Sequence, residues 1–249
     1  MAARRLAKAS PDDLLEEQLA FYRAGAVSYK SWHAEVFERG GGGAFGEISR
    51  RDRTRALVDL GRLAPHGHVL ELAAGTGSYT PALLASATSV TVVDASSESL
   101  RLARSKLAAF ASRLTILEAD IFSWRPTRRY DTVFFSYWLS HVPPIRFDAF
   151  WQLVADALAP DGRVFLIDST GAQGNFSHSS SGGPRYSERD NLVDQTSRRQ
   201  LGGRVYHVVK VAWRPAELES RLADLGWRAE FVEGVHSLWG SAVRRESAA

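Results

Sequence analysis

The sequence contains no cysteine, and this absence excludes several kinds of chemistry at once. Without thiols there can be no disulfide framework, no thiolate nucleophile and no cysteine-ligated metal. Long apolar runs are also missing, since no stretch approaches the ~20 apolar residues of a membrane span. Residues 1–11 lack the apolar block of a signal peptide. We therefore expect a soluble, cytoplasmic protein with no membrane partner.

A large excess of charge of one sign is lacking too, because the formal net charge is only +3. Basic residues are spread along the chain, and acidic residues match them almost everywhere. The basic run at residues 50–53 includes Asp52 and lies in a helical pattern, which indicates a solvated face. Nucleic-acid-binding proteins gather Lys and Arg on one face, so we expect no nucleic-acid partner. Lysine is scarce, with 4 residues against 27 arginines, a bias typical of a GC-rich bacterial genome.

The most informative stretch that is present covers residues 69–86. Val69 to Ala73 predict a buried strand, residues 74–77 (Ala-Gly-Thr-Gly) a tight turn, and residues 78–86 a helix. This order presents backbone N–H groups and a helix N-terminus to a nucleotide-like ligand. Gly75 and Gly77 leave no Cβ between the backbone and that ligand.

Two acids follow at the ends of the next two apolar runs. Asp94 ends the run 89–94, where a carboxylate can accept hydrogen bonds from two ribose hydroxyls. Asp120 ends the run 114–120, where it can receive an adenine amino group beside apolar neighbours. A dinucleotide-binding turn would have a third glycine at position 80, where this chain has Thr80. A nicotinamide-dependent oxidoreductase is therefore the weaker alternative.

The motifs E-L-A-A-G-T-G, V-V-D-A-S and E-A-D-I-F together resemble those of class I S-adenosylmethionine-dependent methyltransferases. The motifs cover roughly residues 65–170. The family usually has glycine where this chain has Ala73, a small substitution that leaves Gly75 and Gly77 in place. The resemblance implies S-adenosylmethionine as cofactor and S-adenosylhomocysteine as product. It also implies a set of cofactor-binding residues: Glu71, Ala73, Gly75, Gly77, Asp94, Ala95, Asp120, Ile121, Ser136 and Tyr137.

Alternating strand and helix patterns from residue 67 to 168 favour an α/β fold with a parallel sheet. We expect one domain over residues 1–249 with a Rossmann-like, seven-stranded, mostly parallel sheet and a reversed C-terminal hairpin. Its parts are an N-terminal helical cap (12–60) interrupted by a glycine linker (40–43), a cofactor-binding core (66–169), a lid with an extra strand at 204–213 (170–213), and a C-terminal helix and hairpin (214–249).

The segment after the fourth strand, residues 135–143, is expected to face the transferred methyl group. His141 is the candidate general base, because its ordinary pKa suits proton removal at neutral pH. The alternative is a histidine that caps the loop before Pro143. Tyr137 and Trp138 are candidates to face the sulfonium and the substrate. Alternation sends neighbouring side chains to opposite faces, so one of the two is expected in the core.

Two other segments supply candidate ligands. Tyr22, Tyr29 and Trp32 can share one face of the N-terminal helix, either as packing or, as in related methyltransferases, close to the cofactor and the substrate. The lid is rich in cations, most of which fit a solvated loop. Lys210 differs, because it alternates with apolar valines in a probable strand. With Arg199 or Arg204 it would form a site for a carboxylate, phosphate or phosphonate.

These patterns predict transfer of a methyl group from S-adenosylmethionine to a small molecule, by a monomer or homodimer. The expected acceptor is an oxygen of an anionic or polar metabolite: a carboxylate, phosphonate or hydroxyl. N-methylation is the alternative within the class, and a non-catalytic cofactor-binding subunit is an alternative of another class. No metal is expected, because Asp168 stands near the fifth strand end while the fourth ends in Ser-Tyr-Trp.

Overall fold

A seven-stranded sheet forms the centre of the molecule, with strand order β3-β2-β1-β4-β5-β10-β9. The computed structural model describes residues 11–170, 185–186 and 196–245. Neighbouring strands from β3 to β5 are parallel, whereas β10 runs antiparallel to both β5 and β9. The predicted sheet with a reversed C-terminal hairpin is therefore confirmed. The strands are β1 (His68–Leu72), β2 (Ser89–Asp94), β3 (Leu114–Glu118), β4 (Tyr130–Ser136), β5 (Leu158–Ser169), β9 (Trp227–Glu233) and β10 (Ser237–Arg244).

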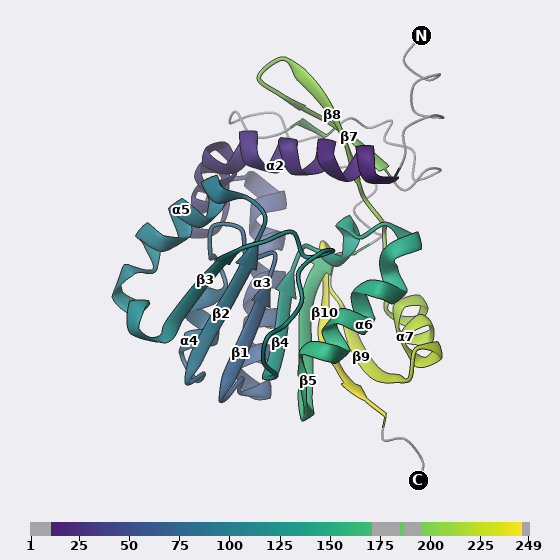
Figure 1. Ribbon diagram of the computed structural model, residues 1–249. Coiled ribbons are helices and arrows are strands. Elements are labelled where there is room, and N and C mark those ends of the chain that lie inside the picture. The colour runs from purple at the N-terminus through teal and green to yellow at the C-terminus, as the bar shows by residue number, and fades with distance from the viewer. Residues whose placement is uncertain (1–10, 171–184, 187–195, 246–249) are drawn as a thin grey trace.

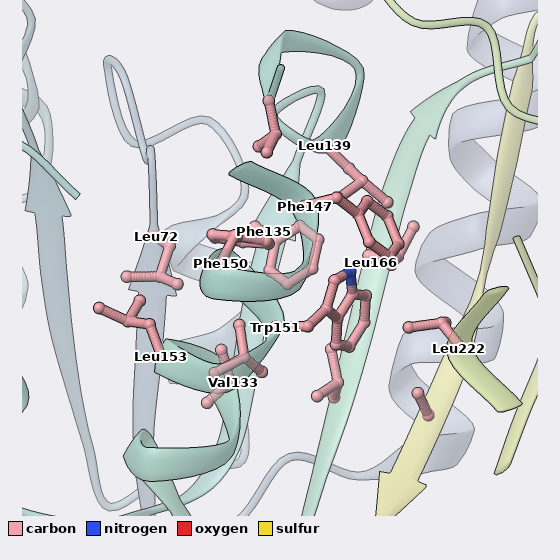
Figure 2. Close-up of a cluster of buried hydrophobic side chains, with 14 of the residues drawn as sticks. Leu72, Val133, Phe135, Leu139, Phe147, Phe150, Trp151, Leu153, Leu166 and Leu222 are labelled. Atoms are coloured by element: carbon pink, nitrogen blue, oxygen red, sulfur yellow. The ribbon is translucent and has the colours of Figure 1, made fainter. Parts of the chain in front are cut away.

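Helices cover both faces of this sheet because its strands carry apolar side chains on both sides (Figure 1). On one face, Phe147, Phe150 and Trp151 of α6 pack against β4 and β5, as Figure 2 shows. On the other face, α3 and α4 pack through Leu60 and Leu83. The helices are α3 (Gly43–Leu63), α4 (Thr80–Leu84), α5 (Ser97–Lys106), α6 (Phe147–Ala157) and α7 (Pro215–Asp224), with the short turns η2 (Ala108–Arg113), η3 (Leu139–His141) and η4 (Pro144–Arg146).

A second, three-stranded antiparallel sheet and the N-terminal helix lie across the carboxyl ends of the parallel strands (Figure 1). The sheet has the order β6-β7-β8, so β8 is an edge strand. Helix α2 packs against β8 and also touches α5. It therefore spans the edge of the large sheet where the strand-end residues gather. These elements are α2 (Pro11–His33), continued by the π-helical turn η1 (Ala34–Glu38), and β6 (Arg185–Tyr186), β7 (Thr196–Leu201) and β8 (Arg204–Val209).

The structure corrects several boundaries expected from the sequence. The glycine linker is shorter, because Gly43 already begins α3. The extra strand ends at Val209 instead of reaching residue 213. Strand β7, which the sequence reading missed, pairs with β8 through a two-residue loop whose glycines, Gly202 and Gly203, both have positive φ. Such a loop is the commonest hairpin connection, and the Gly-Gly pair was its signal.

The basic run at residues 50–53 was expected on a solvated face, and this expectation is wrong. Asp52 is buried and accepts hydrogen bonds from the backbone N–H groups of His236 (2.7 Å) and Ser237 (3.1 Å). Arg50 donates to the carbonyls of Val36 and Gly41. The run therefore ties α3 to the N-terminal segment and to the start of β10.

Within the described part of the chain, no helix is long and apolar enough to cross a membrane.

Candidate functional site

In the turn after β1, three residues have a left-handed backbone: Ala73, Gly75 and Gly77. Ala73 has a φ of 51°, Gly75 of 54° and Gly77 of 70°. A Cβ placed on Gly75 would meet nothing within 4 Å, whereas one on Gly77 would lie 2.8 Å from a methyl carbon of Leu107. Gly77 thus permits close packing under the turn, whereas Gly75 borders open space. Ala73 adopts a conformation that costs L-residues energy.

Asp94 organises the neighbouring strand end. Its two carboxylate oxygens accept hydrogen bonds from the backbone N–H groups of Gly75 and Ser96, each at 2.8 Å. Burial raises the pKa of Asp94, while these backbone hydrogen bonds oppose the rise. Each carboxylate oxygen has a second lone pair. Asp94 thus links the glycine turn to β2 and retains acceptors for a pair of hydroxyls.

Glu71 lies beneath the same turn, in the last part of β1. Its Oε2 accepts a hydrogen bond from the hydroxyl of Thr80 at 2.6 Å, so the residue at the third-glycine position has a role of its own. Its Oε1 is buried and has no hydrogen-bond partner among the described residues. Burial raises the pKa of Glu71 to about 8. A buried, unpaired carboxyl oxygen fits a site completed by a bound donor, such as an ammonium group or a water molecule.

The remaining residues expected at the cofactor lie along the same edge of the sheet. Asp120 is exposed, and its Oδ1 accepts a hydrogen bond from the N–H of Phe122 at 3.1 Å. Ile121 beside it is buried. The carbonyl of Ala95 accepts a hydrogen bond from Arg23 on α2 at 3.0 Å. Ser136 is the last residue of β4 and is half-buried.

Tyr137 and Trp138 diverge to opposite faces of the sheet, as alternation requires. Tyr137 packs on the side of α3 and α4, and its hydroxyl lies 3.0 Å from that of Ser237. Trp138 packs against Phe122 and Phe150 on the α6 side. Its indole Nε1 is buried without a partner among the described residues. Trp138 therefore lies toward the Asp120 end of the sheet edge.

His141 is fully enclosed, and both of its ring nitrogens are engaged. Nδ1 lies 2.7 Å from the carbonyl of Val209, which can only accept, so Nδ1 carries the proton. Nε2 then accepts from the hydroxyl of Tyr22 at 2.9 Å. Burial and the charges of Lys210 and Arg199 lower the pKa of His141 well below its ordinary value. His141 is therefore a neutral imidazole with its basic nitrogen already bonded.

Lys210 stands directly after β8 and reaches back to the large sheet. Its Nζ donates to the hydroxyl of Ser140 in η3 and to that of Ser169 at the end of β5, each at 2.9 Å. Burial lowers the pKa of Lys210 to about 8, the charge of Asp168 opposes this, and Arg199 adds to it. An ammonium has three N–H donors. Two of these donors are used within the described residues.

Asp168 and Arg199 complete the charges around Lys210. Asp168 has no exposed surface and accepts the backbone N–H groups of Ser140 (2.9 Å) and Ser169 (2.6 Å). Arg199, on β7, is only 4% exposed, so its charge acts in a poorly hydrated setting. We call these groups the lysine cluster: Ser140, His141, Asp168, Ser169, Arg199 and Lys210.

Several other expected residues lie elsewhere. Arg204 is exposed, and its guanidinium lies 4.8 Å from the centre of the Tyr206 ring, outside the lysine cluster. Tyr22 contacts His141. The side chains of Tyr29 and Trp32, both on α2, fall outside the described residues. Among the described residues, no group of three or more His, Cys, Asp or Glu is placed to hold a metal.

Two residues near the site were missed by the sequence reading. Arg53 lies over the ring of Tyr79 at 5.0 Å and donates to the carbonyl of Ser78, so a cation stands beside the glycine turn. Gln18 of α2 is buried; its side chain donates to the carbonyl of His141 and accepts from the N–H of Val209. Neither has a local sequence signal, because each acts on residues distant in the chain.

The chain is similar to known proteins in both sequence and fold. A family model described as a methyltransferase domain matches residues 69–162. The structure of the DhpI–SAH complex is 32% identical, with a TM-score of 0.76, and the match covers 96% of this chain and 100% of that chain. The DhpI–SAM–HEP complex is 33% identical, with a TM-score of 0.76 and coverage of 94% and 100%.

A 1,6-didemethyltoxoflavin-N1-methyltransferase of Burkholderia thailandensis, solved with 1,6-didemethyltoxoflavin and S-adenosylhomocysteine, shares the fold. It is 18% identical, with a TM-score of 0.62, and the match covers 96% of this chain and 92% of that chain. No curated protein matches the chain.

Proposed function

Because the chain belongs to the class I S-adenosylmethionine-dependent methyltransferases, we propose that it methylates an oxygen of a small anionic metabolite, a carboxylate or a phosphonate. S-adenosylmethionine is the cofactor, since the DhpI structures hold SAM or SAH. One of them also holds a molecule abbreviated HEP, which supports a small-molecule acceptor here. The single observation that carries the proposal is the position of the Lys210 ammonium, which lies between the hydroxyls of Ser140 and Ser169.

The lysine cluster has more positive than negative charge. Lys210 and Arg199 are both cationic, His141 is neutral, and Asp168 is the one carboxylate of the cluster. The carboxylate of Asp168 also accepts hydrogen bonds from two backbone N–H groups. The Nζ of Lys210 is hydrogen-bonded to two hydroxyls, and an anionic ligand would stabilise its charge. The third N–H of Lys210 is a donor for such a ligand.

The state of His141 favours an acceptor that is already ionised. Methyl transfer breaks the carbon–sulfur bond as the acceptor oxygen bonds the methyl carbon, and the bonding pair stays on sulfur. A hydroxyl or ammonium acceptor must also lose a proton, which needs a base within reach. The basic Nε2 of His141 is bonded to Tyr22 and has a lowered pKa. A carboxylate or phosphonate oxygen needs no base. We therefore assign His141 a structural role, in which its two ring nitrogens hydrogen-bond to Tyr22 and to Val209.

We propose the following residues for the cofactor. Asp94 would bind the ribose hydroxyls, Asp120 the adenine amino group, and Glu71 the methionine ammonium directly or through water. Gly75, Gly77 and Ala73 would form the turn around the cofactor, with Ala95, Ile121, Ser136 and Tyr137 beside it. The bound cofactor supplies an activated methyl group. The protein aligns that group with the acceptor and excludes water.

A labelled-methyl assay tests the proposal. The protein is incubated with methyl-labelled S-adenosylmethionine and a panel of carboxylic acids, phosphonic acids, alcohols and amines. We expect label in the acids alone, as methyl esters that mass spectrometry identifies. Methylation of an amine or an alcohol, with the acids unreactive, would contradict the proposal. Tight binding of S-adenosylhomocysteine with no transfer to any class would favour a non-catalytic subunit.

A further inference from the structure

We infer that Gln18 is a positioning residue: it fixes the backbone of Val209 and thereby holds Lys210 between Ser140 and Ser169. The inference rests on the proposed function only where acceptor affinity is concerned. Gln18 belongs to α2, whereas Lys210 follows β8, so the effect passes between elements that are distant in the sequence.

The side-chain amide of Gln18 bridges two backbone segments. Its Nε2 donates to the carbonyl of His141 at 3.2 Å, and its Oε1 accepts from the N–H of Val209 at 2.9 Å. Gln18 is only 4% exposed, so water does not readily replace either bond. A side-chain amide has a donor and an acceptor on separate atoms, so it can bridge two backbone segments.

Val209 occupies the free edge of the small sheet. Strand β8 pairs with β7 on one side, and the N–H and carbonyl of Val209 bond to Gln18 and to Nδ1 of His141. Two residues later, the N–H of Val211 donates to the carbonyl of Ser140 at 2.8 Å. The residues on both sides of Lys210 are therefore anchored by hydrogen bonds.

This anchoring decides where the ammonium of Lys210 lies. A lysine side chain has four rotatable methylene bonds, and nothing in the chain itself directs it toward two serines. With Val209 and Val211 held, the side chain starts from a set position and its Nζ reaches both hydroxyls at 2.9 Å. Release of Val209 widens the range of positions that Nζ can adopt.

Two variants and a matched control test this role. Gln18→Glu keeps an acceptor for the N–H of Val209 but loses the donor to His141, and Gln18→Leu loses both bonds. Glu16→Gln on the same helix, at an exposed position, is the control. Melting temperatures identify the variants that fold. If Gln18→Leu does not fold, Gln18→Glu, which is the smaller change, is measured in its place.

The first measurement is the acetylation rate of Lys210, followed by mass spectrometry against the exposed Lys30 and Lys106 in the same sample. We expect Lys210 to react several-fold faster in the Gln18 variants than in the wild type, with the control unchanged. An unaltered Lys210 rate in a folded Gln18 variant would overturn the inference. This readout does not depend on the identity of the acceptor.

The second measurement is calorimetric binding of methylphosphonate to protein saturated with S-adenosylhomocysteine. We expect about ten-fold weaker binding in the Gln18 variants, with affinity for S-adenosylhomocysteine within about two-fold of wild type. Equal weakening of both ligands would contradict a role specific to Lys210. If wild-type protein binds neither methylphosphonate nor acetate, the proposed function fails, while the acetylation rates still decide the role of Gln18.

Discussion

The residues proposed for the cofactor come mainly from the ends of β2, β1 and β4, which are neighbours in the sheet. Asp120 lies just after β3. The lysine cluster and its supports instead come from α2, η3, the end of β5, β7 and the residue after β8. The first set is built by turns and by hydrogen bonds between neighbouring strand ends, such as that between Gly75 and Asp94, which are 19 positions apart. The second depends on long-range contacts such as that between Gln18 and Val209. The contrast teaches that the proposed cofactor residues depend on sequence-local turns, whereas the proposed acceptor residues depend on contacts between distant segments.

The largest expected effect is on the cofactor side, at Asp94. Asp94→Ala removes the acceptors for two hydroxyls and leaves the N–H groups of Gly75 and Ser96 without their partner. We expect about 100-fold weaker binding of S-adenosylhomocysteine by calorimetry, because hydrogen bonds to a charged group are among the stronger ones. Asp94→Asn, which keeps one oxygen, should lose less. Undiminished affinity in Asp94→Ala would refute the assignment.

On the acceptor side, Lys210→Met removes the charge while keeping an unbranched side chain. We expect the KM for an anionic acceptor to rise about 30-fold, since truncating a buried charge partner is costly. Affinity for S-adenosylhomocysteine should stay within about two-fold. Lys106→Met, on the exposed surface of α5, is the control. Equal loss of affinity for the acceptor and for S-adenosylhomocysteine in Lys210→Met would contradict separate cofactor and acceptor sites.

The pKa of Lys210 gives the acceptor side its own pH dependence. Because this pKa lies at about 8, the ammonium is charged below that pH and neutral above it. Affinity for acetate, which stays ionised throughout, should therefore fall about ten-fold from pH 7 to 9.5. The same titration on Lys210→Met should show a much flatter curve. A fall of equal size in that variant would assign the titration to another group.

The smallest expected effect is at Ala73, on the cofactor side. Ala73→Gly relieves a left-handed conformation at φ 51° but adds freedom to the unfolded chain. We expect a net gain of about 0.5 kcal/mol in the free energy of unfolding, measured by urea denaturation. S-adenosylhomocysteine affinity should be unchanged. Destabilisation by glycine would show that the methyl group of Ala73 has a packing role.

The local structure of the proposed cofactor side could be predicted from sequence, because its signals are local. The strand, the glycine turn and the acids at 94 and 120 stand in order along the chain, and each is read from its neighbours. On the proposed acceptor side, Lys210 could be predicted because it alternates with apolar valines. Of its two candidate partners, Arg199 lies close enough to affect the pKa of Lys210, whereas Arg204 is exposed. Nothing in the sequence indicated that Gln18 is buried or hydrogen-bonded. Its partner Val209 is 191 positions away, so the contact is seen only once β8 is placed beside α2.

The run at residues 50–53 shows the same limit. Its charge pattern indicated a solvated face, yet Asp52 is buried because two N–H groups at the start of β10 need an acceptor. That demand arises more than 180 residues away in the chain. The charge pattern of a helix thus predicts its average exposure. It does not predict that a single carboxylate is buried because it accepts hydrogen bonds from a distant turn.

The most direct test of the central claim is a crystal structure of the protein with S-adenosylhomocysteine and methylphosphonate together. We expect one phosphonate oxygen within hydrogen-bond distance of the Nζ of Lys210, about 2.7–3.2 Å, and another facing the sulfur of the cofactor product. An anion bound away from Lys210, with Nζ still bonded only to Ser140 and Ser169, would contradict the account.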